Sequence, residues 1–550
     1  MRRFNLSILI ATIALLALAG CPKPPTGNTG STTGTNTGST GGEKRARNYN
    51  FPLPADVKSL DPAHITDTVS DSVAQRLFNR LVKFDTDGSV EPDLAESYEI
   101  SEDGKVYTFH LRSGVKFHNG EDLNSDDVIY SYSRLVDPDT DSERSNLMSY
   151  VAGANDYLGG RAESVSGLQA PDEGTVQITL TAPYAPFLNV LCMTTFGVVP
   201  SSEVERDERG FGANPVGTGP FVFESWTPDE RVVLKANRTY FGNVPEIETL
   251  TFRIIGDEST RFENFRNGTL EHCDIPASKI KTVNDDANLK GLIAGEPAMD
   301  MYAYGFNCDA APFKDNAALR QALNYAVDKQ NIIDNIWGGL VTQQNTIVPA
   351  GMFYHYEGSV SYPYDPEKAA ALLEQAGYPN GEGLPELTLN VDLQEVNKQV
   401  AEAVQEDLSR VGVTVKIERT DWGPFLDKVY AGNSLFFQNT WLGDYPDPDN
   451  WLYQLLCSDN FGDAGNISRW KNSQFDQLVK EAQVEPDQQK RSDLYRQAED
   501  IALNEAPWLL LFWKNSSTLV QPYVKGLTIT KMDRTPQLNN APIEEVTYTD

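Results

Sequence analysis

The chain has 550 residues, with 46 Lys and Arg against 78 Asp and Glu, and its formal net charge is -32. This composition argues against a nucleic acid or an acidic membrane surface as a partner, because both repel a strongly negative protein. The length is enough for two or three domains with large hydrophobic cores.

The N-terminus has the pattern of an export signal. Two arginines precede an uncharged, mostly apolar run over residues 6–19, which is too short to span a bilayer comfortably. The run ends in "LAGC", which resembles a bacterial lipoprotein signal whose cysteine becomes the lipidated N-terminus. We therefore predict a signal peptide over 1–20 and lipidation at Cys21. An ordinary signal peptide with an incidental cysteine is the alternative.

Residues 21–48 are predicted to form a disordered tether, because they lack the apolar residues that a packed core needs. A flexible coil of this length has an end-to-end distance of about 30 Å. No later run has the roughly 18 consecutive apolar residues of a membrane-spanning helix. We expect the globular part to lie close to a membrane and to be held there by the N-terminal lipid alone.

Cysteine spacing gives no sign of a metal or redox site. The four cysteines after Cys21 are Cys192, Cys273, Cys308 and Cys457, and no two of them form a CxxC motif. In an oxidising compartment they allow up to two disulfides, with three pairings open if all four pair. We predict no cofactor and no metal.

The first half of the chain is predicted to consist of short strands and turns. Residues 106–111 alternate between apolar and polar after the hairpin signal Asp103-Gly104, and 175–180 and 249–255 continue the pattern. From Asp315 onward, helical periodicity and capping residues alternate with strand patterns. We expect helices over about 315–338, 365–377, 397–411, from 421 and within 470–505, and strands over 387–393, 413–418, 434–441 and in the tail after 507. This alternation indicates parallel βαβ units and an α/β fold.

The stretch "WLGDYPDPDNWLY" contains the strongest candidate for a binding residue. If 434–441 is a parallel strand, Asp444 lies just beyond its carboxyl end, where open α/β sheets bind ligands, and Gly443 allows a sharp turn. Between Trp441 and Tyr445, this carboxylate could accept charge-assisted hydrogen bonds from a ligand ammonium, worth about 1.5–3 kcal/mol. The alternative is that Asp444 caps a turn or the following helix.

Signatures of catalysis and of calcium binding are weak. The sequence has no GxSxG elbow, HExxH or P-loop, and only five histidines. The acids at 137–141 begin like a calcium loop, but Ser142 and Met148 replace its glycine and glutamate. Both observations disfavour an enzyme or a metalloprotein.

Five stretches together carry a family resemblance. They are 59–135, "PVGTGPFVFESW" (215–226), "CDAAPFKDNAALRQALNYAVDK" (308–329), "YDPEKAAALLEQAGY" (364–378) and "WLGDYPDPDNW" (441–451). They resemble the bacterial solute-binding proteins of the peptide/nickel class that serve ABC importers, above all the oligopeptide and dipeptide binders. The resemblance implies a three-lobed, periplasmic-binding-protein-like α/β fold, with two main lobes joined by a hinge plus an inserted domain that close over the ligand. The implied divisions are lobe I at 49–65, 213–298 and 507–550, inserted domain II at 66–212, and lobe III at 299–506.

The resemblance also implies roles for particular residues. Asp444 matches an aspartate that pairs with the α-ammonium of a peptide, and Trp422 and Trp441 match tryptophans that line side-chain pockets. The further implied ligand-binding residues are Tyr302, Tyr304 and Asn307 on a strand offering backbone hydrogen bonds, Gly443 and Tyr445 beside the aspartate, and Thr66, Asp67 and Thr68 on the opposite wall.

Departures from the family pattern narrow the range of ligands that we expect. No arginine precedes the helix at 397–411, where dipeptide binders receive a carboxylate, so a strict dipeptide specialist is disfavoured. Gln438 replaces an arginine of some oligopeptide binders, and no histidine lies near Asp444, which disfavours nickel. Lys471 stands where the family has a disulfide partner for Cys457, so the disulfide pattern does not transfer.

We therefore expect a monomeric, lipid-anchored extracytoplasmic receptor, in the periplasm or on the cell surface. It would capture short peptides for ABC permease subunits driven by a cytoplasmic ATPase, without catalysis. The alternatives are a receptor for another solute such as an oligosaccharide, a secreted hydrolase, and a structural or signalling lipoprotein.

Overall fold

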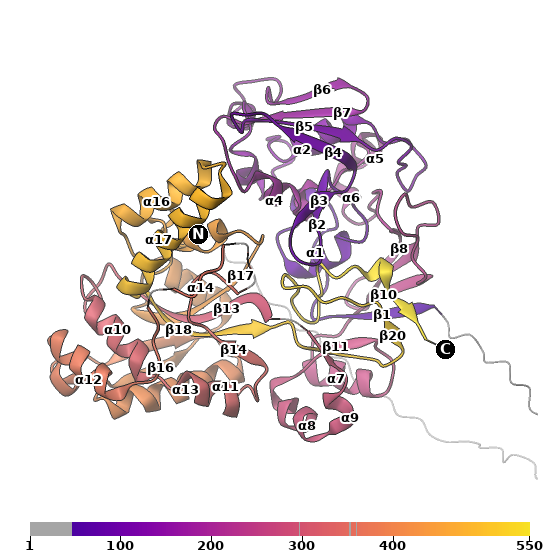
Figure 1. The fold of residues 1–550 in the computed structure, drawn as a ribbon. Helices are drawn as coiled ribbons and strands as arrows, with labels where there is room; N and C mark the ends of the chain where they lie inside the picture. Colours follow the sequence, from indigo (N-terminus) through magenta and orange to yellow (C-terminus); the bar gives the residue numbers. More distant parts are fainter. Residues whose placement is uncertain (1–46, 296, 351, 353, 359, 550) are drawn as a thin grey trace, which may run out of the picture. The chain divides into compact units, whose positions relative to one another are not determined.

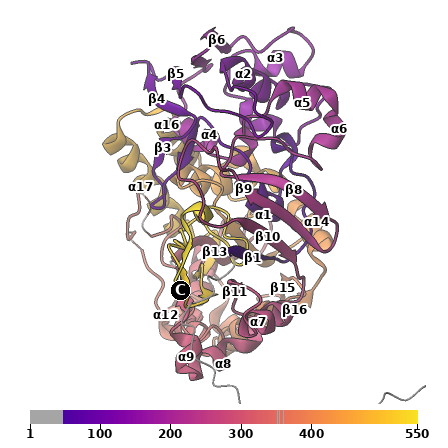
Figure 2. The same cartoon turned by 90° about the vertical axis from the view of Figure 1, so that its right-hand side faces the viewer.

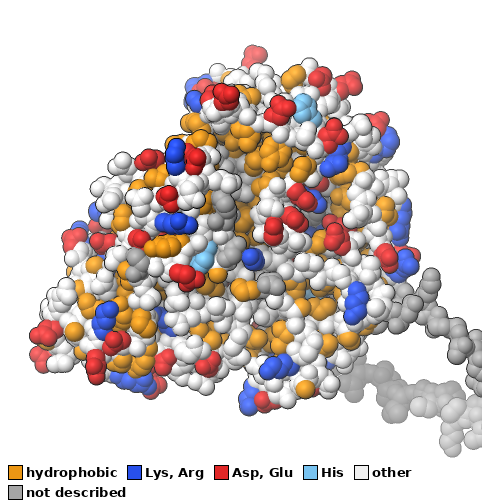
Figure 3. All heavy atoms as spheres, viewed as in Figure 1, with side chains coloured by type: hydrophobic (Ala, Val, Ile, Leu, Met, Phe, Trp, Pro, Cys, Tyr) orange, Lys and Arg blue, Asp and Glu red, His pale blue; other side chains and the backbone are white. Residues whose placement is uncertain are grey.

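The computed structural model describes residues 47–295, 297–350, 352, 354–358 and 360–549 (Figure 1). The predicted signal peptide, Cys21 and nearly all of the predicted tether lie outside the described residues; Asn48, its last residue, begins the first strand. In the part that is described, no helix combines the length and the apolarity needed to cross a membrane. Acidic and basic side chains are interspersed on the face drawn in Figure 3.

One sheet joins the N-terminal strand to a segment near residue 250, and Figure 2 shows its strands side by side. Its order is β1 (Asn48–Leu53), β10 (Thr249–Ile254), β9 (Arg231–Ala236) and β8 (Phe221–Thr227), and only β1 and β10 run parallel. Alternate residues of β1 and β10, such as Phe51 and Phe252, enter one hydrophobic core. A small sheet follows with β11 (His272–Asp274), β19 (Thr518–Val520) and β12 (Ile293–Ala294), near α7 (Glu258–Arg266), α8 (Ile280–Asp285) and α9 (Ala287–Lys290).

A second sheet lies within the predicted inserted domain. Its order is β4 (Ala95–Ile100), β5 (Val106–Leu111), β7 (Thr175–Thr179) and β6 (Leu168–Asp172), all antiparallel. The alternation predicted for β5 is confirmed, since Tyr107, Phe109 and Leu111 are buried in the core. The other elements here are α1 (Thr68–Ala74), β2 (Val82–Phe84), β3 (Val90–Pro92), α2 (Ser125–Arg134), α3 (Ala154–Leu158), α4 (Phe187–Leu191), α5 (Ser201–Arg206) and α6 (Glu208–Phe211).

The largest sheet carries the candidate site and has six strands. Its order is β14 (Val341–Gln343), β18 (Trp508–Asn515), β13 (Pro297–Phe306), β17 (Phe436–Leu442), β15 (Leu387–Val391) and β16 (Val415–Arg419). Parallel pairing, as predicted, joins β15 to β16 and to β17, whereas β13, β14 and β18 pair antiparallel. The tail strand β18 thus belongs to this sheet, although the predicted boundary at 507 assigns it to lobe I. The three-lobe division itself stays a prediction.

Two hydrophobic cores cover the two faces of this sheet. On β13, Tyr302, Tyr304 and Phe306 enter one core, while Met301 and Ala303 enter the other, as the two-residue period of a strand requires. The first face is covered by α10 (Ala317–Ala326), α11 (Lys329–Asn335), α12 (Pro366–Gln375) and α13 (Glu395–Arg410), and the second by α15 (Leu452–Leu456), α16 (Ser473–Val484) and α17 (Gln488–Glu505). The single helix predicted over 315–338 is two helices, because Asp328 caps a new one by accepting from Asn331 N.

None of the four described cysteines is bonded to another, so neither of the two possible disulfides is formed. Cys192, Cys273 and Cys457 are buried, and Cys308 is half-buried. Burial raises the pKa of all four thiols, which keeps them protonated at neutral pH.

Glu499, buried on α17, gives a prediction on pH and stability. Its Oε1 accepts hydrogen bonds from the backbone N–H groups of Ile347 (2.7 Å) and Val348 (2.9 Å). Burial raises the pKa of its carboxyl from 4.5 to about 7. Between these values the folded state holds a proton that the unfolded state has released, so the free energy of unfolding falls as the pH rises through this window. Glu499→Gln retains an oxygen acceptor and should melt higher than the unsubstituted protein at about pH 8, but equally near pH 4; a lower melting temperature at pH 8 would contradict this.

Candidate ligand-binding site

Asp444 lies two residues beyond the end of β17, at the carboxyl edge of the parallel strands. The backbone at Gly443 lies against the indole of the buried Trp451, and a Cβ atom at this position would overlap that ring. The glycine is needed for this contact, since its backbone is not in the left-handed region. The turn and short helix that follow, η6 (Pro448–Asn450), are capped by Asp447, whose side chain accepts from Asp449 N. Asp447, and not Asp444, is therefore the cap of this helix.

One asparagine fixes the Asp444 carboxylate. Asn450 Oδ1 accepts from Asp444 N (3.0 Å) and from Trp441 Nε1 (2.8 Å), while Asn450 Nδ2 donates to Asp444 Oδ2 at 3.3 Å. Part of the Asp444 side chain is exposed, but many protein atoms surround the carboxyl. They displace water from it, and this desolvation raises the pKa of the carboxyl. The charge of Arg144 and the Asn450 hydrogen bond lower that pKa, and the charge of Asp71 raises it. The exposed surface faces a cavity.

Asp444 lines two adjoining cavities, which share Thr66, Leu442, Asp444 and Arg534. The larger, the main cavity, has a volume of about 870 Å³, within the usual range for small-molecule sites. Its remaining lining residues are Asp300, Asp392, Leu393, Gln394, Asn397, Trp422, Phe425, Leu426, Val429, Tyr430, Gln438, Asn439, Thr440, Trp441, Leu455, Gly465, Ile467 and Lys514. The smaller, the side cavity, has about 190 Å³ and is also lined by Ile65, Asp67, Thr68, Asp71, Gln75, Phe84, Arg144, Cys192, Met193, Thr194, Thr195, Gly443, Met532, Asn539 and Asn540.

A free strand edge forms one wall of the main cavity. Among the described residues, β15 pairs with β17 only at Phe436 and Phe437. On the other side of β17, Gly443 N donates to Met299 O, which continues the register of β17 with β13. The odd-numbered residues of β17 are therefore the ones whose backbone groups form hydrogen bonds with β13. The backbone groups of Thr440 and Leu442, beyond the part of β17 that pairs with β15, consequently point away from β13, along the cavity wall.

An aromatic helix end forms another wall. The helix α14 (Trp422–Tyr430) buries Phe425 and Val429 in a small core with Phe437. Trp422 stacks on Phe425 with ring centroids 5.4 Å apart, yet 50% of its surface is exposed, and it lines the cavity. A large exposed indole on a cavity wall can cover an apolar ligand group.

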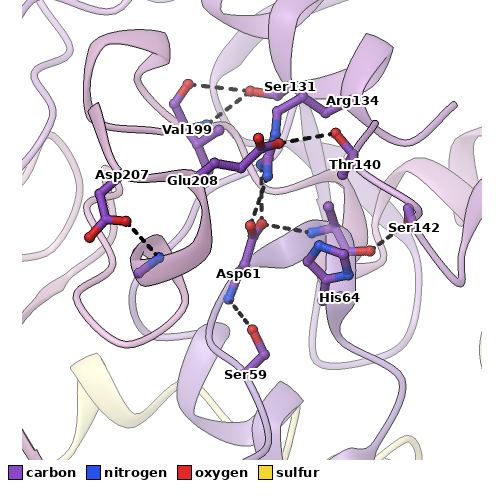
Figure 4. Close-up of polar contacts among 12 residues, drawn as sticks. Ser59, Asp61, His64, Ser131, Arg134, Thr140, Ser142, Val199, Asp207 and Glu208 are labelled. Atoms are coloured by element: carbon purple, nitrogen blue, oxygen red, sulfur yellow. Dashed lines mark hydrogen bonds and ion pairs between the residues drawn. The ribbon is translucent and has the colours of Figure 1, made fainter. Parts of the chain in front are cut away.

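The segment from Ile65 to Thr68 lines the side cavity, and its Thr66 also lines the main cavity. This segment follows η1 (Pro62–His64), whose N-cap is Asp61. The two terminal nitrogens of Arg134 donate to the two carboxylate oxygens of Asp61 at 3.1 and 2.8 Å in a buried ion pair (Figure 4). Asp67 accepts from Val69 N and Ser70 N as the N-cap of α1. Thr66 and Thr68 thereby reach the cavities from a segment that hydrogen bonds hold at Asp67.

The structure brings seven of the predicted residues to the walls of the cavities: Asp444, Trp441, Trp422, Gly443, Thr66, Asp67 and Thr68. Tyr445 itself lines neither cavity, because its ring is buried in the core of residues 63–198 and its hydroxyl donates to Asp449 Oδ2 at 2.9 Å.

Tyr302, Tyr304 and Asn307 are not brought to either cavity. The strand β13 lies between β17 and β18, so its backbone groups are used within the sheet, and both tyrosine rings are fully buried. The Asn307 side chain donates to Gly432 O at 2.9 Å. The free backbone groups predicted for this strand are found on its neighbour β17.

Charged residues from distant segments complete the site. Lys514 Nζ lies 3.6 Å from Asp300 Oδ2 and 5.6 Å from the centroid of the Tyr302 ring. Burial lowers the pKa of Lys514, and the nearby charge of Arg534 lowers it further, while Asp300 and Asp392 raise it. No local sequence signal points to Lys514, Arg534 or Arg144, because none of them stands in a recognisable motif. In the described residues, no group of three or more His, Cys, Asp and Glu side chains could hold a metal ion.

Comparisons with known proteins define the class. The family model described as "Bacterial extracellular solute-binding proteins, family 5 Middle" matches residues 89–463, so the chain belongs to this family. Heme-binding protein A of Haemophilus influenzae is 32% identical over 540 residues, covering 94% of this chain and 95% of that protein. The dipeptide-binding protein of Escherichia coli is 32% identical over 486 residues, covering 85% and 89%.

A solved relative shares the fold. The periplasmic binding protein DppA of Helicobacter pylori, associated with an ABC transporter and solved in complex with the peptide STSA, has a TM-score of 0.74 and 27% identity. The comparison covers 92% of this chain and 98% of that one. The α/β fold of periplasmic binding proteins and the peptide/nickel class of solute-binding proteins, both expected from the sequence, are thus confirmed. The family consists of binding proteins and not of enzymes, which removes the hydrolase alternative.

Proposed function

We propose that this protein is a receptor for short peptides, which it captures in the main cavity by their α-ammonium group. The observation that carries the proposal is the Asp444 carboxylate, held by Asn450 and open to both cavities. A hydrogen bond between an ammonium and a carboxylate is charge-assisted, and it is stronger than a hydrogen bond between neutral groups. The dipeptide named for the Escherichia coli relative and the peptide bound to the Helicobacter pylori relative support this ligand class.

The remainder of the peptide would extend along β17. Its backbone would pair with the outward groups of Thr440 and Leu442, as in strand addition. Main-chain hydrogen bonds of this kind do not depend on the peptide sequence. Trp422 and Trp441 would cover side chains of the ligand, and the volume of about 870 Å³ leaves room for several. The ligand would be longer than one residue and variable in sequence.

Delivery and anchoring complete the proposal. The protein would be lipidated at Cys21, stay monomeric outside the cytoplasm, and hand its peptide to ABC permease subunits with a cytoplasmic ATPase. The sequence "LAGC" at 18–21 and membership of an extracellular solute-binding family support this.

Native mass spectrometry of the purified full-length protein tests the ligand class. Adducts at peptide masses, released by denaturation and identified by sequencing, are expected. An empty protein would then be titrated with a tripeptide, its N-acetylated form, hemin and an oligosaccharide. Binding of the tripeptide but not of its acetylated form supports the proposal, because acetylation removes the ammonium; selective binding of hemin or oligosaccharide would refute it.

A further inference from the structure

We infer that the side cavity selects peptides whose first residue has an acidic side chain. The inference rests on the proposed function, because it takes the peptide ammonium to lie at Asp444. The side cavity meets the main cavity at that carboxylate, and its volume of about 190 Å³ is far below the 870 Å³ of the main cavity. It has room for one side chain next to the ammonium, and not for a further stretch of peptide.

Arg144 supplies the first free cation of the side cavity. Its Nε donates to Ile65 O at 3.0 Å, which holds the guanidinium against the segment that forms the cavity wall. Its two terminal nitrogens make no hydrogen bond to any described residue. The charge of Arg144 reaches Asp444, since it lowers the pKa of that carboxyl. An anion between Arg144 and the ligand ammonium would therefore have donors on two sides.

Arg534 supplies the second cation, at the junction of the two cavities. Its guanidinium forms no ion pair or hydrogen bond with a described residue, and its charge disfavours the charged form of Lys514 nearby. Repulsion between these two cations is relieved when an anion binds beside them. The planar guanidinium also matches a carboxylate in geometry, because it can donate two parallel hydrogen bonds.

Two of the three acids of the side cavity keep their charge but use their oxygens as acceptors within the protein. Asp67 accepts three hydrogen bonds at the start of α1, and Asp71 accepts from Asn539 Nδ2 at 2.7 Å and from Gln75 Nε2 at 3.4 Å. Asp444 remains open, and the buried Asn539 Oδ1 has no donor among the described residues. The free acceptors suit the N–H groups of an ammonium, and the free arginines suit a carboxylate. An N-terminal glutamate or aspartate offers both.

Isothermal titration of the full-length protein with three peptides tests this. Glu-Ala-Ala is expected to bind about tenfold more tightly than the isosteric Gln-Ala-Ala, in line with a charge-assisted hydrogen bond, and Lys-Ala-Ala should bind more weakly than both. The double variant Arg144→Gln/Arg534→Gln should reduce the ratio between the glutamate and glutamine peptides to about one. Arg209→Gln, at an exposed arginine that lines neither cavity, should leave the ratio at about ten.

The outcomes separate the inference from the proposed function. Equal affinity of the unsubstituted protein for the glutamate and glutamine peptides overturns the inference and leaves the peptide receptor standing. A tenfold ratio that persists in the double variant overturns the role of the two arginines. If no peptide binds, the proposed function fails and the inference with it. The single variants Arg144→Gln and Arg534→Gln, each checked by its melting curve, replace the double variant if it does not fold.

Discussion

Asp444→Asn is expected to raise the dissociation constant of a tripeptide by about tenfold or more, because a charge-assisted hydrogen bond is lost at a poorly solvated position. The asparagine keeps the size of the side chain and can still contact Asn450, so the loop should retain its shape. Isothermal titration at about pH 7 measures the effect. Unchanged affinity would exclude Asp444 as the anchor of the ammonium.

Two controls isolate the charge of Asp444. The N-acetylated tripeptide should bind weakly to the unsubstituted protein and lose little further in the variant, since it carries no ammonium. Asp427→Asn removes the same charge from an exposed position of α14 that lines neither cavity, and it should leave the affinity unchanged. An equal loss with Asp427→Asn would mean that long-range charge, and not contact, governs binding.

The same carboxyl should make binding sensitive to acid. Burial raises the pKa of Asp444 above that of an ordinary aspartate. As the pH falls, Asp444 is protonated earlier than exposed acids, so peptide affinity should decline while the rest of the surface charge is still present. The Asn variant should lack this decline.

Local sequence patterns were sufficient where a residue interacts with its chain neighbours. Alternation predicted β5, and Asp365 with Pro366 predicted the start of α12, because burial period and capping depend on a few adjacent residues. The position of Asp444 beyond a strand end followed in the same way. Gly443 was predicted for its turn, but the reason for the glycine is Trp451, eight residues away.

The order of strands in the sheet and the charged residues of the cavity walls could not be predicted from local sequence patterns. The strand holding Tyr302 was correctly predicted, but no local signal shows that β18 covers its second edge and leaves the free edge to β17. The arginines of the side cavity come from residues 144 and 534, which only the tertiary fold brings together. Family resemblance supplied the roles of Asp444 and Trp441, which lie in one recognisable stretch, and of Trp422 earlier in the chain, but it gave no account of the side cavity.

Arg491→Met is expected to lower the free energy of unfolding by about 3–5 kcal/mol, because it leaves buried carboxylates without their cation. Arg491 donates to both oxygens of Asp447, at 2.7 and 2.9 Å, and both side chains are buried. Its Nε also donates to Ala482 O at 2.9 Å. Asp449 lies beside this pair, and burial together with the charge of Asp447 raises the pKa of its carboxyl to about 6 even with Arg491 present. Urea unfolding of the variant measures the loss.

The position of this ion pair links stability to binding. Asp447 caps η6, and η6 ends at Asn450, which holds Asp444. Arg491→Met should therefore weaken peptide binding as well, although it touches neither cavity. The double variant Arg491→Met/Asp447→Asn removes both charges of the ion pair and should regain part of the lost stability, because Asp449 is then the one carboxylate of this pair of acids left without its cation. A double variant as unstable as the sum of the two single variants would show that the packing of the arginine, and not its charge, supports the loop.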